Sequence, residues 1–189
     1  DCTAGCAMEG ISYVSASSDI CFKVSADVKL AVGNGREHPD GEDQPLPPTT
    51  LRGLYGSEAV AAKALSHEFR SYDFVLQHIN DSDNADLRHL HVPLCCLVHY
   101  LGCTVLCSCT LPISSDSLIY GSENAGEPNM RLHSKVPRLN AIMDLLGSSM
   151  NLKPHECCGC RVSGPVDMQG HYGSGGRYYL KDMARLCPA

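Results

Sequence analysis

The segment from Gly170 to Arg185 reads GHYGSGGRYYLKDMAR. Aromatic and apolar residues stand on both sides of a group of glycines at positions 173, 175 and 176. Glycine readily adopts the positive φ angles that a tight chain reversal requires. The segment therefore predicts a β-hairpin, with a first strand at His171 and Tyr172, a turn over 173–176 and a second strand over 177–181.

The second strand of this hairpin is predicted to use both of its faces. Because side chains alternate along a strand, Tyr178 and Leu180 should face one side, and Tyr179 and Lys181 the other. Asp182 follows the strand, and we expect it to pair with Arg185 where the chain leaves the hairpin.

The composition favours a globular domain in a reducing compartment. Hydrophobic residues make up 43% of the 189 residues, which is enough for a core. Twelve cysteines among 189 residues fall below the share, about 8–10%, that indicates a disulfide scaffold, so we expect reduced thiols and a cytoplasmic location, with disulfides as the alternative. The chain does not begin with Met, and we expect it to be one domain of a longer protein.

The charge and hydropathy restrict the partners. The net charge is −6, so any contact with nucleic acid would have to use a local basic patch. No run of about 18 apolar residues occurs, so no membrane span is predicted. The first residues lack the basic-then-apolar pattern of a signal peptide.

Hydrophobic periodicity predicts an α+β fold, in which an antiparallel sheet built from hairpins packs against two main helices in one or two lobes. Strands are expected over 11–14, 20–25, 94–100, 103–111 and 118–120. The segment 157–167 is predicted to be irregular. The segment 33–50 is rich in Gly, Pro and acidic residues, and it is predicted to be a mobile insertion.

The two helices have different signals. The first should begin after Ser57, and its buried face should contain apolar residues at helical spacing, namely Ala61, Leu65, Phe69, Tyr72, Leu76 and Ile79. The second is expected over 136–150, with Pro137 in its first turn and a buried face made of Leu139, Ile142, Leu146 and Met150.

Three charged residues suggest a nucleotide or phosphate site. Protein kinases use a lysine on an early strand, a glutamate on the next helix and an aspartate after a late strand to hold ATP and magnesium. Lys23, Glu68 and Asp182 occur in that order and on those elements. However, no G-x-G-x-x-G precedes Lys23, no H-R-D occurs, and Met-Ala-Arg follows Asp182 in place of Phe-Gly. The alternative is that each residue is an ordinary solvated or ion-paired group.

A second constellation suggests zinc. Cys157 and Cys160 form a C-x-x-C, and His155 stands just before it. A structural zinc ion needs four ligands, and no second C-x-x-C completes the set. A thiol-rich loop beside the core is the competing interpretation.

The motifs taken in order resemble the Clu domain of the clustered-mitochondria family. That family has a stretch of the form G-x-D-G-R-x-Y-x-L-D-x-x-R, which is filled here by Gly173, Gly176, Arg177, Tyr179, Asp182 and Arg185. Gly175 stands where the family usually has Asp, and Lys181 where it usually has Leu. Shorter pieces such as Phe22-Lys23-Val24 and Tyr120-Gly121-Ser122 occur in the same order, so the resemblance covers nearly the whole chain.

The resemblance implies one Clu-like domain over 1–189 that acts as a non-catalytic binding or scaffold domain of a cytoplasmic protein. It also implies a part in mitochondrial distribution, with mRNA, ribosome-associated proteins and other domains of the same chain as partners. Two alternatives remain open: a kinase-like nucleotide-binding enzyme or pseudoenzyme that uses ATP and Mg²⁺, and a zinc-stabilised interaction module. No catalytic residue is predicted.

Overall fold

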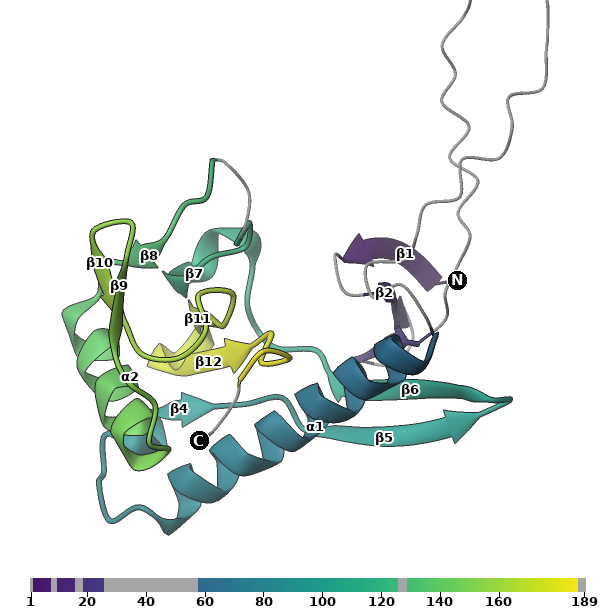
Figure 1. The fold of residues 1–189 in the computed structure, drawn as a ribbon, viewed down its shortest axis with the longest axis horizontal. Helices are drawn as coiled ribbons and strands as arrows, with labels where there is room; N and C mark the ends of the chain where they lie inside the picture. Colours follow the sequence, from purple (N-terminus) through teal and green to yellow (C-terminus); the bar gives the residue numbers. More distant parts are fainter. Residues whose placement is uncertain (1, 8–9, 16–18, 26–57, 126–128, 187–189) are drawn as a thin grey trace, which may run out of the picture.

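The computed structural model describes residues 2–7, 10–15, 19–25, 58–125 and 129–186 (Figure 1). The segment 33–50, predicted to be an insertion, and Ser57, predicted to cap the first helix, lie outside these residues. Three sheets and two helices form the described structure. The predicted α+β class is confirmed.

The first sheet is an antiparallel sheet with five strands in the order β1-β2-β3-β6-β5. Its strands are β1 (Cys2–Ala7), β2 (Gly10–Ser15), β3 (Ile20–Val24), β5 (Cys95–Tyr100) and β6 (Cys103–Cys109). The predicted strands over 11–14, 20–25, 94–100 and 103–111 all belong to this sheet. The strand β1 was not predicted, because its small residues lack the alternation that indicates a half-buried strand.

The second sheet also has five strands, in the order β4-β12-β11-β7-β8. It contains the C-terminal hairpin at its centre, as β11 (Gln169–Tyr172) and β12 (Tyr178–Lys181). The other strands are β4 (Leu90–His91), β7 (Leu118–Gly121) and β8 (His133–Ser134). All pairs are antiparallel except β4 with β12, which is parallel. Short 3-10 helices cover 87–89, 115–117 and 174–176.

The predicted C-terminal hairpin is confirmed, and its turn shows why glycine is used there. The φ angle of Gly176 is +74°, in the left-handed region. A Cβ atom at Gly173 would lie 2.4 Å from the ring of Tyr179, so this position tolerates no side chain without movement of the ring. Tyr178 and Tyr179 are both buried, because both faces of β12 are covered.

The segment predicted to be irregular after position 157 contains a small hairpin instead. Strand β9 (His155–Cys157) pairs with β10 (Cys160–Val162). The turn between them consists of Cys158 and Gly159, and both have positive φ angles of 51° and 73°. Two positive φ angles in a two-residue turn fit the sharp twist of a hairpin. Cysteine is not a typical residue for this turn, which explains why the hairpin was not predicted from sequence patterns.

The helix α1 (Glu58–Asp81) has 24 residues and a buried stripe that differs from the predicted one. Leu76, predicted to be buried, is 40% exposed, whereas Val75 is fully buried. The buried stripe therefore follows positions 61, 65, 68, 72, 75 and 79. This spacing places the carboxylate of Glu68 in the middle of the face that packs on the protein.

The two helices join the sheets through one core. The helix α2 (Pro137–Ser149) begins with Pro137 as predicted, and all four residues of its predicted face are buried. Figure 1 shows α1 running along the first sheet toward α2 and β4. Tyr72, Val75 and Ile79 of α1 share a hydrophobic cluster with residues of α2 and with Leu180 of β12. The end of β12 is thereby held near the middle of α1.

Candidate functional site

The three charged residues singled out in the sequence lie together. Lys23 is on β3, and its side chain is 14% exposed. Its Nζ atom lies 2.8 Å from Oε1 of Glu68 and 3.4 Å from Oδ1 of Asp182. The partners are 45 and 159 residues away in the sequence, so only the fold brings them to Lys23. We call Lys23, Glu68 and Asp182 the charged cluster.

Strand alternation directs Lys23 toward α1. Lys23 pairs with Ser12 on one side and Leu106 on the other, so it lies within the first sheet. Cys21 precedes it on the same face and is close enough to the cluster to feel the charges of Lys23 and Glu68. Burial raises the pKa of the Cys21 thiol, so this neighbour stays protonated and neutral near pH 7.

Glu68 is the most enclosed member of the charged cluster, with 1% of its side chain exposed. Its Oε1 atom accepts hydrogen bonds from Lys23 and from the hydroxyl of Tyr72, at 2.8 Å and 3.0 Å. Its Oε2 atom is buried and has no hydrogen-bond partner. A buried carboxylate oxygen without a donor is costly, and such atoms occur often at functional sites.

Asp182 follows β12 in an unusual backbone conformation. Its φ angle is +58°, in the left-handed region that few residues other than glycine adopt. Its Oδ2 atom lies 3.4 Å from Nζ of Lys181, and its side chain is 23% exposed. The carboxylate therefore faces two lysines and remains open to solvent on one side.

Tyr72 is a member of this site that the sequence interpretation assigned only to the hydrophobic face of the helix. Its hydroxyl donates to Glu68 and accepts the backbone N–H of Asp182 at 3.1 Å. Burial, followed by the charge of Glu68, holds the pKa of Tyr72 well above its usual value, so the hydroxyl keeps its proton. The i, i+4 spacing of Glu68 and Tyr72 was the signal that could have linked them.

The expected pair between Asp182 and Arg185 is not formed. Arg185 lies 3.3 Å from Asp167 instead, and Asp182 pairs with Lys23 and Lys181. The left-handed turn at Asp182 directs the carboxylate back toward the first sheet. Asp167 is mostly enclosed, and burial raises the pKa of its carboxyl although Arg185 opposes this.

A neighbouring site surrounds His171, which is 3% exposed. Its Nδ1 lies 2.9 Å from Oγ of Ser117, and its Nε2 lies 3.1 Å from Oε1 of Gln169. Burial lowers the pKa of His171 to about 4, with Lys181 as a further cause. His171 is therefore neutral near pH 7 and serves as a hydrogen-bonded core residue.

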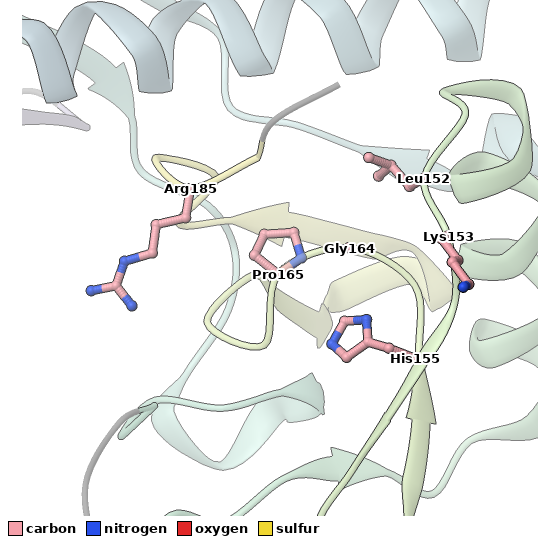
Figure 2. A pocket seen from close by; sticks show the side chains of 6 residues that line it. All are labelled: Leu152, Lys153, His155, Gly164, Pro165 and Arg185. Carbon is pink, nitrogen blue, oxygen red and sulfur yellow. The ribbon is translucent and has the colours of Figure 1, made fainter. Parts of the chain in front are cut away.

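The segment after α2 lies at a separate pocket of about 230 Å³. Lys153, His155 and Arg185 line this pocket together with Leu152, Gly164 and Pro165. Figure 2 shows the ends of the Lys153 and Arg185 side chains on opposite sides of it, pointing away from each other. These cations therefore do not converge on one ligand position.

The zinc candidates are only partly brought together. Cys157 and Cys160 face each other across the β9–β10 hairpin. Within the described residues, no group of three or more His, Cys, Asp or Glu side chains has a geometry that could hold a metal ion. The geometry thus gives no support to a zinc-stabilised module.

The residues of the C-terminal motif have mostly structural positions. Gly173 and Gly176 form the turn, Tyr179 packs in the hairpin, and Asp182 joins the charged cluster. Arg177 is exposed where β12 begins. This motif therefore connects the hairpin with the charged cluster.

The fold and the site define an α+β domain in which a strand lysine, a helix glutamate and an aspartate after a late strand meet. The family model that matches residues 13–189 is described as Clustered mitochondria. The chain belongs to this family, as the sequence motifs indicated. The family connects the chain with mitochondrial clustering at the level of the family as a whole.

The other comparisons gave no relatives. Neither the curated proteins nor the solved structures contain a match to this chain. In the described part of the chain, no helix has both the length and the apolar character needed to cross a lipid bilayer.

Proposed function

We propose that this domain binds a magnesium-bound nucleotide at the charged cluster and acts as a non-catalytic binding and scaffold domain of a cytoplasmic protein in mitochondrial distribution. The observation that carries the nucleotide site is the convergence of Lys23, Glu68 and Asp182. Their contacts, 2.8 Å and 3.4 Å from Nζ of Lys23, join three elements that are distant in the sequence.

The arrangement agrees with the roles that such residues have in protein kinases. There a strand lysine contacts the phosphates, a helix glutamate orients the lysine, and an aspartate holds Mg²⁺. In this chain β3 supplies the lysine, α1 the glutamate, and the end of β12 the aspartate. The Oε2 atom of Glu68 is buried without a donor, which is costly and is a feature that functional sites often show.

The chain would supply one carboxylate to a magnesium ion, and the nucleotide phosphates would supply further oxygen ligands. Mg²⁺ prefers oxygen ligands and is usually bound through one or two carboxylates together with substrate phosphates. Asp182 offers a carboxylate that is 23% exposed, and Lys23 would contact a phosphate from the other side. The ion would neutralise phosphate charge, while this chain orients the ligand.

The proposal is limited to binding because the residues that transfer a phosphoryl group in kinases are missing. The sequence has neither the glycine-rich phosphate loop nor the H-R-D motif. Lys153 and His155 follow α2, and they line a pocket whose lining includes no member of the charged cluster. Ligand binding without turnover is therefore the expected activity.

Thermal unfolding with and without Mg²⁺-ATP tests the nucleotide site. A ligand at ten times its dissociation constant should stabilise the domain by about 1.4 kcal/mol, which raises Tm by about 3–5 °C. K23M should remove this shift. R161A is the matched control, since Arg161 pairs with Asp144 at the surface, where both side chains are well exposed. Absence of any shift at millimolar Mg²⁺-ATP would refute the site.

A role in binding mRNA or ribosome-associated proteins is a second proposal, supported by the family and by one local feature. Arg138 Nη2 lies 3.1 Å from Nε2 of His89. Burial and the nearby charge of Arg177 lower the pKa of His91. Arg138 and Arg177 thus flank the segment 89–91, and they form a local basic patch on a chain with a net charge of −6.

RNA binding measured over a salt series tests this patch. The double variant R138A/R177A should weaken binding and flatten the dependence on salt, because fewer phosphate contacts release fewer counterions. The variant R70A/R161A removes the same charge elsewhere on the surface and should bind like the wild type. If the domain binds no RNA even at low salt, the patch is not an RNA site and RNA contacts belong to other domains.

A further inference from the structure

Tyr72 joins two members of the charged cluster through a single hydroxyl group. The hydroxyl donates to Oε1 of Glu68 at 3.0 Å and accepts the backbone N–H of Asp182 at 3.1 Å. Glu68 and Tyr72 lie one turn apart on α1, whereas Asp182 lies 110 residues further along the chain. One side chain of α1 therefore holds the carboxylate of the helix and the backbone of the β12 end at the same time.

The backbone of Asp182 needs such a contact. A left-handed conformation costs about 1–2 kcal/mol for a residue with a side chain, and the observed φ angle is +58°. Without it, the chain would leave β12 in another direction and carry the carboxylate away from Lys23. The hydrogen bond from the Asp182 N–H to Tyr72 fixes the turn in the one geometry that completes the cluster.

A purely hydrophobic role for Tyr72 does not explain these contacts. The side chain is 4% exposed and belongs to the core cluster, where phenylalanine would fill nearly the same volume. A buried hydroxyl is unfavourable unless it is hydrogen-bonded, and both of its bonds go to members of the charged cluster.

We propose that Tyr72 is a positioning residue that ties the Asp182 turn to α1, so that the metal-binding carboxylate is held beside the lysine–glutamate pair. This inference rests on the proposed nucleotide site and adds a positioning residue to it.

The test compares Y72F with Y120F. Tyr120 is the matched control, because it is also buried and its hydroxyl accepts the backbone N–H of Ser163 at 2.8 Å, away from the cluster. The affinities of Mg²⁺-ATP and of ATP without metal are measured for wild type and both variants. Y72F should weaken Mg²⁺-ATP about tenfold, as expected from the loss of a hydrogen bond that positions a charged group. Metal-free ATP, held by Lys23, should bind Y72F as it binds the wild type.

The outcomes separate this inference from the site itself. If wild type does not bind Mg²⁺-ATP, the proposed nucleotide site fails. If wild type binds and Y72F binds equally well, or if Y72F loses both ligands in proportion, the positioning role fails. Y120F should lose thermal stability without a change in either affinity.

A measurement on the wild type covers the case in which Y72F does not fold. Amide hydrogen exchange at Asp182 should be slow without ligand, since Tyr72 accepts this N–H in the ligand-free structure. Slower exchange at Asp182 and along the middle of α1 should appear together on addition of Mg²⁺-ATP. Rapid exchange at Asp182 in the ligand-free protein would overturn the proposal.

Discussion

Burying the carboxylate of Glu68 costs free energy of folding, although the charged cluster cannot form without it. Its side chain is almost fully enclosed, and it depends on Lys23 and Tyr72 for hydrogen bonds to one oxygen. Removing one partner of a buried ion pair leaves an uncompensated charge, whereas removing both can be nearly neutral. The order of stabilities among single and double variants therefore reports whether the pair forms as described.

We expect K23M to lower the free energy of unfolding by about 2–3 kcal/mol, less than the loss for a fully buried pair because Lys23 retains some solvent contact. The double variant K23M/E68Q should be more stable than K23M alone, since glutamine carries no charge. Urea unfolding of the wild type, K23M, E68Q and the double variant measures both effects. Losses that simply add would show that Lys23 and Glu68 do not interact.

His171 predicts how stability depends on pH. Its folded-state pKa of about 4 lies below the ordinary value of 6.5, so the unfolded state binds the proton more readily between these values. Stability should therefore be constant above about pH 6.5 and fall as the pH decreases toward 4, by up to about 3 kcal/mol. Unfolding free energies measured across this range, together with an NMR titration of the imidazole, test the prediction.

H171Q provides the comparison for this pH dependence. Glutamine does not titrate, so the variant should lose part of the decline between pH 6.5 and 4 even if it is less stable throughout. An imidazole that titrates near pH 6.5 in the folded protein would contradict the buried, neutral state of His171.

The sequence could identify the members of the charged cluster but not their geometry. Lys23, Glu68 and Asp182 were recognisable because a lysine on a strand, a glutamate on a helix and an aspartate after a strand have known roles together. The contact between Tyr72 and the Asp182 backbone was not predictable. It depends on the left-handed turn at Asp182, and no glycine or asparagine marks that position.

At the scale of elements, α1 is positioned by a stripe that combines apolar and polar residues. The predicted stripe followed apolar residues alone and therefore included Leu76, which is exposed, and omitted Glu68. The observed stripe alternates steps of three and four residues through Glu68 and Val75. The error came from building the buried stripe from apolar residues only, whereas Glu68 can be buried because Lys23 compensates its charge.

Because the buried face of α1 is rotated from the predicted one, substitutions at two adjacent apolar residues should lower stability by different amounts. V75A should destabilise the protein by about 1–3 kcal/mol, because it removes methyl groups from a site with no solvent contact. L76A should change stability by less than about 1 kcal/mol, because Leu76 is 40% exposed. Urea or thermal unfolding measures both, and equal losses would show that the helix faces the core differently.

Strands were predictable where alternation or glycine turns were present. The hairpin over 171–181 and the pair β5–β6 followed from these signals. The hairpin over 155–162 did not, since its turn uses Cys158 and Gly159 within a cysteine-rich segment. The parallel pairing of β4 with β12 joins segments almost ninety residues apart, and short-range patterns contain no information about it.

At the scale of the whole molecule, the charged cluster lies where two sheets approach each other. Lys23 belongs to the first sheet, Asp182 follows a strand of the second, and Glu68 lies on the helix that contacts both parts of the core. A ligand bound to the charged cluster would contact groups from both sheets, and its binding would therefore affect how the two sheets lie relative to each other. Membership in the Clustered mitochondria family could be inferred from motif order, whereas the meeting of Lys23, Glu68 and Asp182 depends on this three-dimensional arrangement.

The cysteines give a prediction for the whole chain. The nine cysteines from Cys21 to Cys160 are free thiols, and they differ in exposure. Cys96 and Cys158 are exposed, whereas burial raises the pKa of Cys95 to about 11. The thiolate is the reactive form, so Cys95 should react slowly with an alkylating reagent at pH 8.

Brief alkylation of the native protein followed by peptide mass spectrometry should therefore modify Cys96 and Cys158 first and Cys95 last. Labelling after unfolding without a reductant should reach all nine thiols equally, which serves as the control for intrinsic reactivity. Rapid labelling of Cys95 in the native protein would contradict its partly buried position against the core. If one of the nine cysteines becomes reactive only after reduction, that cysteine forms a disulfide and is not a free thiol.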